Sequence, residues 1–393
     1  MKNSISLLIG HVSNYIVPFS LLFLLSRDLN EQSFSFFMYS QVVLVWSGMF
    51  IEYGFTLRAI RYLKKDNINV KELYNIVQTT KIVLSIIAFF ISYTILRISN
   101  MSDDINYILI CLIFIAFGMR ANWYFIAKEN SSLMTKIDVI ASILLVILLY
   151  ILKVTNVTYV LILLLIYRTI PTIIHFYIIT ELNSFKLVSI SEVYKELKTG
   201  LPLFIHIFSV SFYSTFNSLY LGLIFPSAII INYINAEKLN NIAIGLFYPI
   251  VNSVIPRVME GNQKAKNIGI LVIISYSLLC IFGVYLLGDW IITLIFSDKY
   301  INSVHYLKVL CFAIPLVGVN YIIGQLILIP MGLEKLIAKT TVIAGIINVI
   351  LLLYITNYLK DISYIPYLVI FIEGLIMFML TFSFLKIKRV RND

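Results

Sequence analysis

The sequence predicts an all-α integral membrane protein in which about twelve transmembrane helices form two six-helix lobes around a central cavity. Of the 393 residues, 60% are hydrophobic and only 13% are charged, and the mean hydropathy is +0.93, far above that of ordinary soluble domains. Apolar runs of about 18 or more residues, each long enough to cross a bilayer as a helix, recur along the whole chain. An internal repeat then predicts the division into two lobes.

Each lobe is expected to contain six spans. The first span follows Lys2 without a small-residue cleavage site, so we expect a retained helix rather than a signal peptide. The N-terminal lobe covers residues 1–180, the C-terminal lobe covers 201–386, and a basic tail covers 387–393. In chain order, the predicted spans are 7–25, 34–57, 76–98, 105–126, 137–152, 157–179, 201–224, 228–256, 268–288, 304–330, 340–356 and 365–385.

The segment 181–200 is predicted to be a cytoplasmic linker between the lobes. It is the most polar stretch of its length in the chain. Within this segment, the residues SISEVYKEL (189–197) have the pattern of a short amphipathic helix, which we expect to lie on the membrane surface.

Lysine and arginine residues between the spans are distributed unequally. If the N-terminus is cytoplasmic, 20 of them lie on the cytoplasmic side and only 5 on the other side. Basic residues retained on the cytoplasmic side set the orientation of a membrane protein, so both termini are expected in the cytoplasm. The outer loops are short and leave no room for an enzyme domain outside.

A repeated segment relates the two halves of the chain. KIDVIASILLVILL (136–149) aligns without gaps with KTTVIAGIINVILL (339–352) and matches it at 9 of 14 positions. The offset of 203 residues pairs the fifth predicted span with the eleventh. Because each lobe would hold an even number of spans, both lobes are expected to have the same orientation in the membrane, as in transporters with parallel repeats.

Apart from Arg97, which lies at the outer end of its span and is one of the five bases on the outer side, five of the 30 basic residues fall within predicted spans, and they are the main candidates for a substrate site. A basic side chain near the middle of a bilayer costs roughly 2.5 to 3.5 kcal/mol, so it normally faces a partner or a water-filled pathway. Arg168 and Lys238 lie at least about ten residues from either end of their spans and are expected to line such a pathway. Lys81, Arg120 and Lys308 lie closer to span ends, where each could instead extend to the interface.

A polar stripe marks the eighth span. At about 100° per residue, Asn235, Lys238 and Asn241 fall on one helix face and are predicted to face an aqueous lumen. Glu237 points about 100° away and is expected to contact a neighbouring helix. In the alternative interpretation, these polar residues only join helices through hydrogen bonds and need no substrate.

Four residues, Glu237 among them, are candidates for coupling or gating. Glu52 and Glu373 lie within spans, where each could pair with a buried base or titrate as a proton or sodium site. Glu52 is nearer the cytoplasmic end of its span and could instead cap the inner gate of its lobe. Pro18 could form a hinge in the first span, although a static kink explains this proline equally well.

The chain lacks the signatures of several other classes of protein. It contains no glycine-rich phosphate loop, HExxH motif or nucleophile elbow, so we expect a transporter driven by an ion gradient or by its substrate, not an enzyme. Cys111, Cys280 and Cys311 fall in apolar runs without metal-binding spacing, so no metal or cofactor is predicted. The net charge of +10 follows from the cytoplasmic loops, so nucleic acid is not an expected partner.

Five segments keep an order and a spacing that point to a known family. They are EYGF (52–55), NWYFIAKENSSLMTKI (122–137), YINAEKLNNIAIGLFYPIVNSVIPR (233–257), YINSVHYLKVLCFAIP (300–315) and GQLILIPMGLEKLIAKT (324–340). Over essentially the whole chain, they resemble the polysaccharide transporters of the multidrug/oligosaccharidyl-lipid/polysaccharide (MOP) flippase superfamily, and most of all the O-antigen flippases of the Wzx type.

The resemblance implies a MOP/MATE-like fold in the bacterial inner membrane. It also implies a substrate, undecaprenyl-pyrophosphate-linked oligosaccharide, that moves from the inner to the outer leaflet during O-antigen or related polysaccharide synthesis. Lys238 occupies the position of the family's EKL motif, and we add Arg168 and Arg120 as bases of a cationic lumen that would neutralise the pyrophosphate. The implied partners are membrane lipids, H+ or Na+, and polysaccharide polymerase and chain-length proteins.

Three alternative functions agree less well with the sequence. An ion-coupled exporter of cationic drugs from the same superfamily would need an acidic or apolar cavity, whereas five bases lie within the spans here. An O-antigen polymerase would be expected to carry a long outer loop with arginines, and the outer loops are short. A lipid II flippase is a closer rival, but its relatives usually have two further spans.

Overall fold

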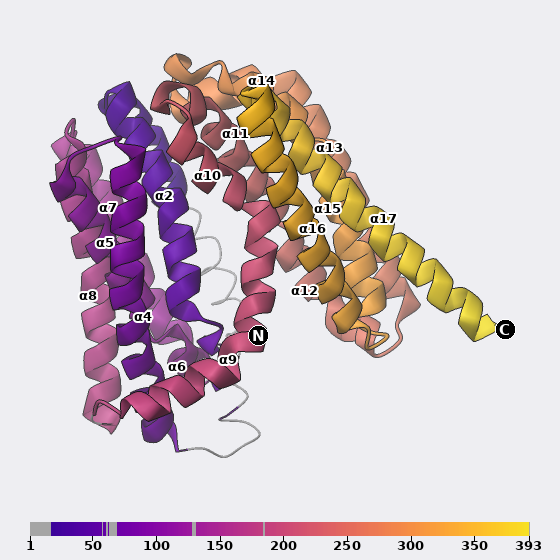
Figure 1. Cartoon of the computed structure of the whole chain (residues 1–393), viewed down its shortest axis with the longest axis horizontal. Helices are drawn as coiled ribbons and strands as arrows, with labels where there is room; N and C mark the ends of the chain where they lie inside the picture. Colours follow the sequence, from indigo (N-terminus) through magenta and orange to yellow (C-terminus); the bar gives the residue numbers. More distant parts are fainter. Residues whose placement is uncertain are drawn as a thin grey trace. The chain divides into compact units, whose positions relative to one another are not determined.

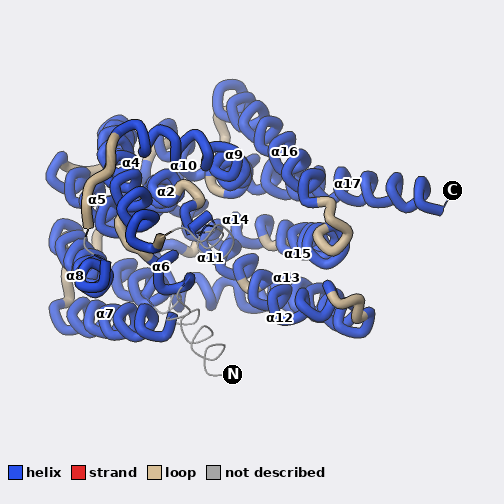
Figure 2. The backbone as a smooth tube through the Cα atoms, turned by 90° about the horizontal axis from the view of Figure 1, so that it is seen from below, coloured by secondary structure: helices blue, strands red, loops and turns tan. Residues whose placement is uncertain are grey.

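The computed structural model describes residues 17–56, 58–59, 62, 69–127, 131–183 and 185–392. Within these ranges the regular secondary structure is entirely helical, as Figure 2 shows. The predicted all-α fold class is thereby confirmed. The chain divides into two compact units, Met1–Phe208 and Ser209–Asp393, and the division falls inside helix α9 (Ile190–Ser214), shortly after the predicted linker.

Unit 1 is built around helix α5. After a helical stretch at residues 17–28, this unit contains α2 (Glu31–Glu52), α4 (Val70–Ser99), α5 (Asp104–Gly118), α6 (Asn122–Ala127), α7 (Ser131–Leu152), α8 (Val157–Asn183) and the first part of α9. Helix α5 packs against α2, α4 and α8, and α7 packs against α8 (Figure 1).

Unit 2 is built around α15 in a similar way. It contains α10 (Phe216–Ile224), α11 (Ser227–Gly245), α12 (Phe247–Met259), α13 (Gln263–Phe296), α14 (Ser303–Leu310), α15 (Ala313–Ile323), α16 (Glu334–Tyr354) and α17 (Ile365–Asn392), with short η helices between some of them. Helix α15 packs against α13 and α17, and α16 packs against α17. Since α7 and α16 carry the two copies of the repeated segment, the packing pattern follows the sequence repeat.

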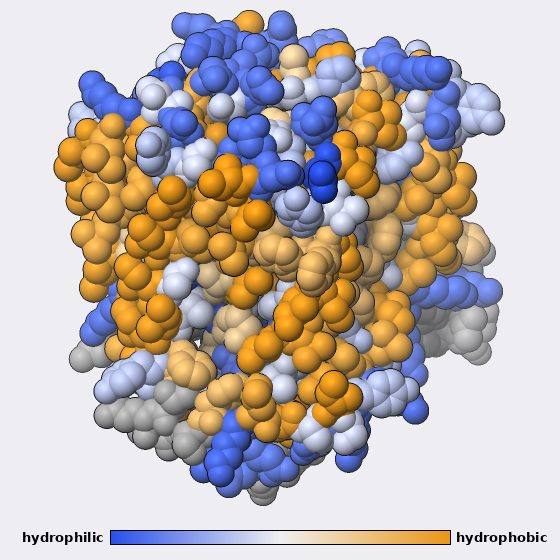
Figure 3. Space-filling view, turned by 60° about the vertical axis from the view of Figure 1, so that its left-hand side comes forward, coloured by the Kyte–Doolittle hydropathy of each residue, from blue (hydrophilic) through white to orange (hydrophobic). Residues whose placement is uncertain are grey.

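Nine helices of the described chain are long and apolar enough to cross a membrane, and they coincide with nine of the predicted spans. They are Glu31–Glu52, Val70–Ser99, Asp104–Phe125, Leu133–Leu152, Val157–Ile179, Gln263–Phe296, Ser303–Leu328, Lys335–Leu359 and Ile362–Lys386. On the face drawn in Figure 3, hydrophobic side chains form a broad zone between two hydrophilic ends. The protein is therefore a multi-pass membrane protein.

Of the three remaining predicted spans, one lies mostly outside the described residues, and each of the other two is divided between two helices. Span 7–25 falls mostly outside the described residues. Span 201–224 is divided between α9 and α10 at Thr215, whose φ and ψ angles of -137° and -8° are not helical. Span 228–256 is divided between α11 and α12, where Pro249 has no N–H to donate to the carbonyl group of Gly245.

The amphipathic segment of the predicted linker is helical from Ile190 onward. Ser189 and Glu192 form a reciprocal cap at its start, since the backbone N–H of Ser189 donates to the Glu192 carboxylate at 2.9 Å and the N–H of Glu192 donates to the Ser189 hydroxyl at 3.4 Å. The Ser189 hydroxyl also donates to the Glu192 carboxylate at 2.6 Å, and this hydrogen bond, together with the one from the Ser189 N–H, holds the pKa of Glu192 below its usual value. The first part of α9 runs across the ends of α4 and α8 in Figure 1 before the helix bends, and Pro202 lies inside it.

Candidate functional site

A cluster of charged residues lies inside unit 1, and we call Glu52, Lys81, Arg120 and Asp138 the charged cluster. The Lys81 ammonium donates to Oε2 of Glu52 at 2.7 Å and to the backbone carbonyl of Arg120 at 3.0 Å. The side chain of Lys81 is only 1% exposed. Lys81 is therefore held by partners within the unit and does not extend to the membrane interface.

Backbone geometry places Glu52 at this point. Helix α2 ends because Tyr53 and Gly54 have φ angles of 47° and 77°, in the left-handed region that ends helices. The Glu52 carboxylate then accepts hydrogen bonds from the backbone N–H of Thr56 at 2.9 Å and from the Thr56 hydroxyl. The segment EYGF thus turns the chain and fixes the carboxylate toward Lys81.

A second interruption of the helices leaves a backbone carbonyl free to accept a hydrogen bond from Lys81. Helix α5 ends at Gly118, and the chain resumes as α6 only at Asn122. A Cβ atom on Gly118 would lie 2.5 Å from Cγ2 of Ile51, so glycine is needed for α5 to approach α2 this closely. The interrupted backbone leaves the carbonyl of Arg120 free to accept from Lys81, and the cluster sits at the junction of α2, α4 and α5.

Arg120 is paired with Asp138, which the sequence did not identify as a candidate. The Arg120 guanidinium donates to the Asp138 carboxylate on α7, and the arginine is 8% exposed. The sequence contains one indication of Asp138, because it is a carboxylate at the second position of the predicted span 137–152. The charged cluster therefore contains two acids and two bases, each neutralised by a partner.

Arg168 lies near this cluster on α8 but is not neutralised in the same way. Its guanidinium carbon lies 4.8 Å from the centre of the Phe117 ring and 4.9 Å from that of Tyr167. Among the described residues, no acidic side chain is within ion-pair distance of it. Asp138 attracts Arg168 electrostatically from beyond ion-pair distance, and contacts with aromatic rings stabilise a cation only partly, so Arg168 has no direct anionic partner among the described residues.

A cavity of about 490 Å³ adjoins the charged cluster. Its polar lining includes Glu52, Thr56, Arg120 and Asn122, and its apolar wall includes Phe117. The volume is within the range of small-molecule sites, roughly 300 to 1,000 Å³. Because α2 and α5 both end here, the cavity lies at the end of unit 1 that the charge distribution predicts to be cytoplasmic.

In unit 2, the polar residues of α11 separate into paired and unpaired groups. Glu237 is 8% exposed and accepts hydrogen bonds from the Ser218 hydroxyl on α10 and from the Tyr233 hydroxyl at 3.1 Å, so its expected contact with a neighbouring helix is observed. Lys238 is half-buried and is attracted electrostatically by Glu237, but no described acidic side chain lies within ion-pair distance of its ammonium group. The base at this position is thus available to an anion.

The other members of the polar stripe lie in different environments. Asn235 is 0% exposed, and neither end of its amide has a hydrogen-bond partner among the described residues. Asn241 is exposed. The predicted contribution of both asparagines to an aqueous lumen stays a prediction.

The remaining candidates occupy separate places. The Asn320 amide donates to Oε2 of Glu373 at 2.9 Å and to its backbone carbonyl at 3.2 Å, and no described basic side chain pairs with this glutamate. Lys308 lies 3.6 Å from the Asp289 carboxylate, and both side chains are partly exposed, in agreement with an interfacial position. Pro18 lies in the helical stretch 17–28, and its role as a hinge stays a prediction.

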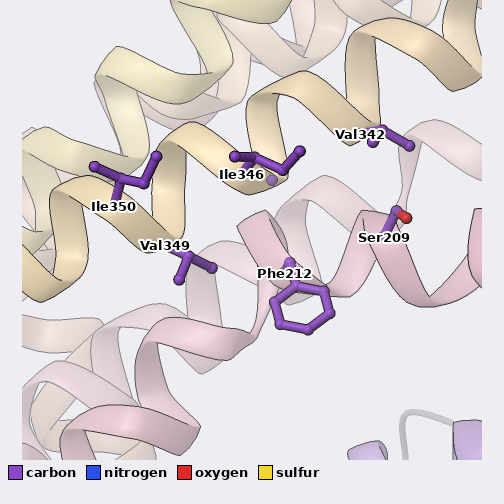
Figure 4. A pocket seen from close by; sticks show the side chains of 7 residues that line it. Ser209, Phe212, Val342, Ile346, Val349 and Ile350 are labelled. Atoms are coloured by element: carbon purple, nitrogen blue, oxygen red, sulfur yellow. The ribbon is translucent and has the colours of Figure 1, made fainter.

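Unit 2 also contains an apolar groove between α9 and α16 (Figure 4). It encloses about 320 Å³, and its walls include Phe212, Ile346 and Ile350. Gly345 allows the two helices to approach, since a Cβ atom there would lie 3.1 Å from the backbone carbonyl oxygen of Ser209. The groove contributes no charged group, so an ionic head group must be recognised elsewhere.

A buried ion pair that the sequence did not predict holds the first part of α9 on unit 1. The Arg58 guanidinium donates to the carboxylate of Glu196 and, at 3.0 Å, to its backbone carbonyl. The Tyr53 hydroxyl donates to the backbone carbonyl of Leu197 at 3.2 Å. The linker helix is thereby attached at the end of α2 where the charged cluster begins.

Comparisons with known proteins agree with the fold and with the resemblance in the sequence. A family model described as "Polysaccharide biosynthesis protein" matches residues 1–262. A protein of Shigella dysenteriae described as "Putative O-antigen transporter" is 24% identical over 362 residues, which are 89% of this chain and 91% of that protein. A protein of Escherichia coli (strain K12) with the same description is 24% identical over 384 residues, 92% of this chain and 91% of that protein.

Two solved structures share the fold. The lipid II flippase MurJ in an inward closed conformation has a TM-score of 0.69 at 14% identity and covers 97% of this chain and 87% of its own. An inward-facing multidrug resistance MATE family transporter of the MOP superfamily has a TM-score of 0.63 at 14% identity and covers 96% of this chain and 94% of its own. At this identity the two likenesses concern the fold alone.

Proposed function

The chain belongs to the polysaccharide biosynthesis protein family, and from this premise we propose that it is a flippase for lipid-linked glycans. The proposed substrate is an undecaprenyl-pyrophosphate-linked repeat unit of O-antigen or a related polysaccharide. It would move from the cytoplasmic to the periplasmic leaflet of the inner membrane by alternating access. Relatives described as O-antigen transporters and the fold shared with MurJ and MATE proteins support this proposal.

The observation that carries the proposal is the presence of unneutralised bases within membrane-spanning units. Arg168 and Lys238 have no acidic partner within ion-pair distance among the described residues. Removing such a charge from water is costly unless a ligand or water-filled cavity compensates it. A pyrophosphate group supplies the missing negative charge, and it accepts strong charge-assisted hydrogen bonds from both side-chain types.

Within unit 1, the charged cluster offers a way to accept and release such an anion. Arg120 lines the cavity and is bonded to Asp138, while Lys81 behind it is bonded to Glu52. A phosphate oxygen entering the cavity would compete with these carboxylates for the bases. This competition would weaken the binding of the anion, so that an anion captured by the bases could also be released.

Glu373 is the proposed coupling residue. Its carboxyl group contacts a neutral amide, that of Asn320, and no described base holds it in the charged form. Glu52, in contrast, is already neutralised by Lys81 and would have to lose that partner to exchange a proton. The coupling ion, H+ or Na+, would therefore bind at Glu373 during the transport cycle.

The proposal is tested by deleting the gene in its native polysaccharide-producing host and locating the lipid-linked repeat units. We expect complete units to accumulate on the cytoplasmic leaflet, and plasmid-borne protein to restore surface glycan. A periplasm-directed glycosidase or oxidant, which cannot reach the inner leaflet, distinguishes the two locations. Normal surface glycan in the deletion strain would refute the proposal.

Drug export by a MATE-like mechanism is the second candidate, because the fold is shared with multidrug transporters. The unneutralised bases disfavour it, since they would repel a cationic drug. The same deletion strain decides between the two functions. Increased sensitivity to cationic dyes with normal surface glycan would support drug export, and the converse supports the glycan flippase.

A further inference from the structure

A second pocket lies in unit 1, at the ends of its helices opposite the charged cluster. It encloses about 480 Å³ and is formed by the connections that precede α2, α5 and α8. Most of its lining consists of uncharged polar side chains, among them Asn30, Gln32, Asn106, Thr155 and Asn156. The charge distribution predicts this end of the unit to be outside the cell membrane.

The lining has hydrogen-bonding groups that the fold does not use. Asn106 is 3% exposed, and its amide nitrogen donates to the Ser102 hydroxyl at 2.9 Å, but its Oδ1 has no partner among the described residues. Exchanging the amide nitrogen and oxygen would leave the nitrogen unpaired instead. A buried polar atom without a partner is energetically costly, so this atom indicates a ligand or bound water.

In two further side chains of the lining, only the amide oxygen forms a hydrogen bond. Oδ1 of Asn30 caps α2 by accepting from the N–H of Ser33 at 2.8 Å, and Oδ1 of Asn156 caps α8 by accepting from the N–H of Thr158 at 2.8 Å. In each of these side chains the amide nitrogen has no hydrogen-bond partner among the described residues. Donors and acceptors are therefore both present around the pocket, as a hydroxyl-bearing ligand requires.

Charge argues against an anionic ligand. Three helices begin at this pocket, and their N-termini carry partial positive charge. Acidic residues already compensate it, since Glu31 and Asp104 lie in the first turns of α2 and α5 and Asp103 lines the pocket. A phosphate would meet these carboxylates, whereas a neutral ligand would not.

We propose that this pocket binds a neutral, hydroxyl-rich sugar residue of the glycan at the outer face of unit 1. The inference rests on the proposed function, which brings a glycan to that face. Its volume is within the usual range of ligand sites, and amide and hydroxyl groups are complementary to sugar hydroxyls, which both donate and accept. The pocket would hold the glycan at the outer face after translocation and so disfavour its return to the inner leaflet.

The test measures binding of a soluble glycan to the purified full-length protein in lipid nanodiscs. The probe is the repeat-unit oligosaccharide of the native host, released from its lipid by mild acid and labelled at the reducing end. The main variant, Asn30→Ser with Asn156→Ser, keeps both helix caps because serine also caps, but it removes both unused amide nitrogens. We expect the Kd to rise about tenfold, as for the loss of two hydrogen bonds.

A second variant and a control complete the test. Thr155→Trp fills the pocket from an exposed position and should abolish binding without altering a cap. Asn357→Ser makes the matched change at an exposed position of unit 2 and should leave the Kd unchanged. Failure of the wild-type protein to bind the oligosaccharide, or equal binding by all variants, would overturn the proposal.

Inorganic diphosphate is the competing probe. If diphosphate binds and the double variant weakens that binding, the pocket is an anion site and the sugar assignment is wrong. The two proposals also fail separately. Absence of oligosaccharide binding overturns the pocket while the deletion strain can still show flippase activity, and normal surface glycan in that strain refutes the flippase whether or not the sugar binds.

Discussion

The ammonium group of Lys81 lies 2.7 Å from the carboxylate of Glu52, within an ion pair that joins the last residue of α2 to the middle of α4. Lys81 is 1% exposed, and its side chain also supports the break after α5 through the Arg120 carbonyl. One buried base thus joins α2 and α4 to the segment after α5, next to the cavity of unit 1. The pair has both a structural and a proposed functional role, and the two can be separated by mutation.

Replacing Lys81 by methionine should destabilise the protein by about 2 to 4 kcal/mol. The change leaves Glu52 and the Arg120 carbonyl without their partner, and breaking one side of a buried pair is costly. The Glu52 side chain is 38% exposed, so part of the cost is reduced by water. Unfolding of the purified protein in detergent, followed by intrinsic fluorescence, measures the difference.

Two comparisons control this experiment. The double variant Glu52→Gln with Lys81→Met removes both charges and should be more stable than Lys81→Met alone. Lys308→Met removes the base of the exposed pair with Asp289 and should cost less than about 1 kcal/mol. Equal losses for Lys81→Met and Lys308→Met would show that the pair with Glu52 is not buried as described.

The helices were predictable from the sequence, whereas the ion pairs were not. Apolar runs of membrane length are a local signal, and they located nine spans that the structure also contains. Glu52 and Lys81 were both identified as unusual, but their contact depends on how α2 packs against α4, which periodicity does not encode. Asn320 was missed because a single amide in an apolar helix gives no signal until its partner, Glu373, is known.

The positions at which helices are interrupted could not be predicted from local sequence patterns either. The span predicted at 228–256 is continuous by hydropathy, yet it is divided near Pro249 in the structure. The turn after α2 depends on Gly54, and only the φ angle of 77° in the structure reveals this role of the glycine. Both features concern backbone geometry, and both help to determine where charged side chains lie.

Replacing Lys238 by alanine should reduce surface glycan at least tenfold, while the amount of protein in the membrane stays the same. The proposed function requires an unneutralised base here, and the large effect follows from losing a charge-assisted contact with pyrophosphate. Glycan is measured by gel profile in the complemented deletion strain. Lys238→Arg should retain part of the activity, and Lys299→Ala, at an exposed base, should retain all of it. Normal glycan with Lys238→Ala would reduce this lysine to a structural role.

Replacing Glu373 by glutamine should remove the dependence of transport on the H+ or Na+ gradient. Glutamine keeps a side-chain oxygen that can accept from Asn320, so the unfolding free energy should change by less than about 1 kcal/mol. The loss of a group that can bind an ion would then be the main effect. Transport is followed in vesicles as the external pH and the sodium concentration are varied.

The control for this variant is Asp361→Asn. Asp361 is exposed and accepts from the backbone N–H of Ser363 at 2.9 Å, a contact that asparagine also makes. Its conversion should leave the gradient dependence unchanged. A pH and sodium profile of Glu373→Gln that matches the wild-type profile would argue against a coupling role.

Replacing Gly200 by alanine should detach the first part of α9 from unit 1. A Cβ atom at this position would overlap the Arg58 guanidinium, a flexible group that would have to move away from Glu196. We expect a net loss of roughly 1 to 2 kcal/mol, because the broken ion pair outweighs the higher helix propensity of alanine. Hydrogen exchange should become faster in residues 190–199, whereas α13 should be unaffected.

Gly283→Ala is the matched control for this change. Gly283 lies within α13, and nothing lies within 4 Å of the Cβ that alanine would add. Alanine should therefore leave the protein as stable or stabilise it by up to about 1 kcal/mol, since glycine is unfavourable inside a helix. If Gly200→Ala behaves like Gly283→Ala, the contact between Arg58 and Glu196 does not attach the linker helix. If only Gly200→Ala speeds exchange, the attachment is established, and its effect on glycan transport then shows whether release of α9 accompanies the transport cycle.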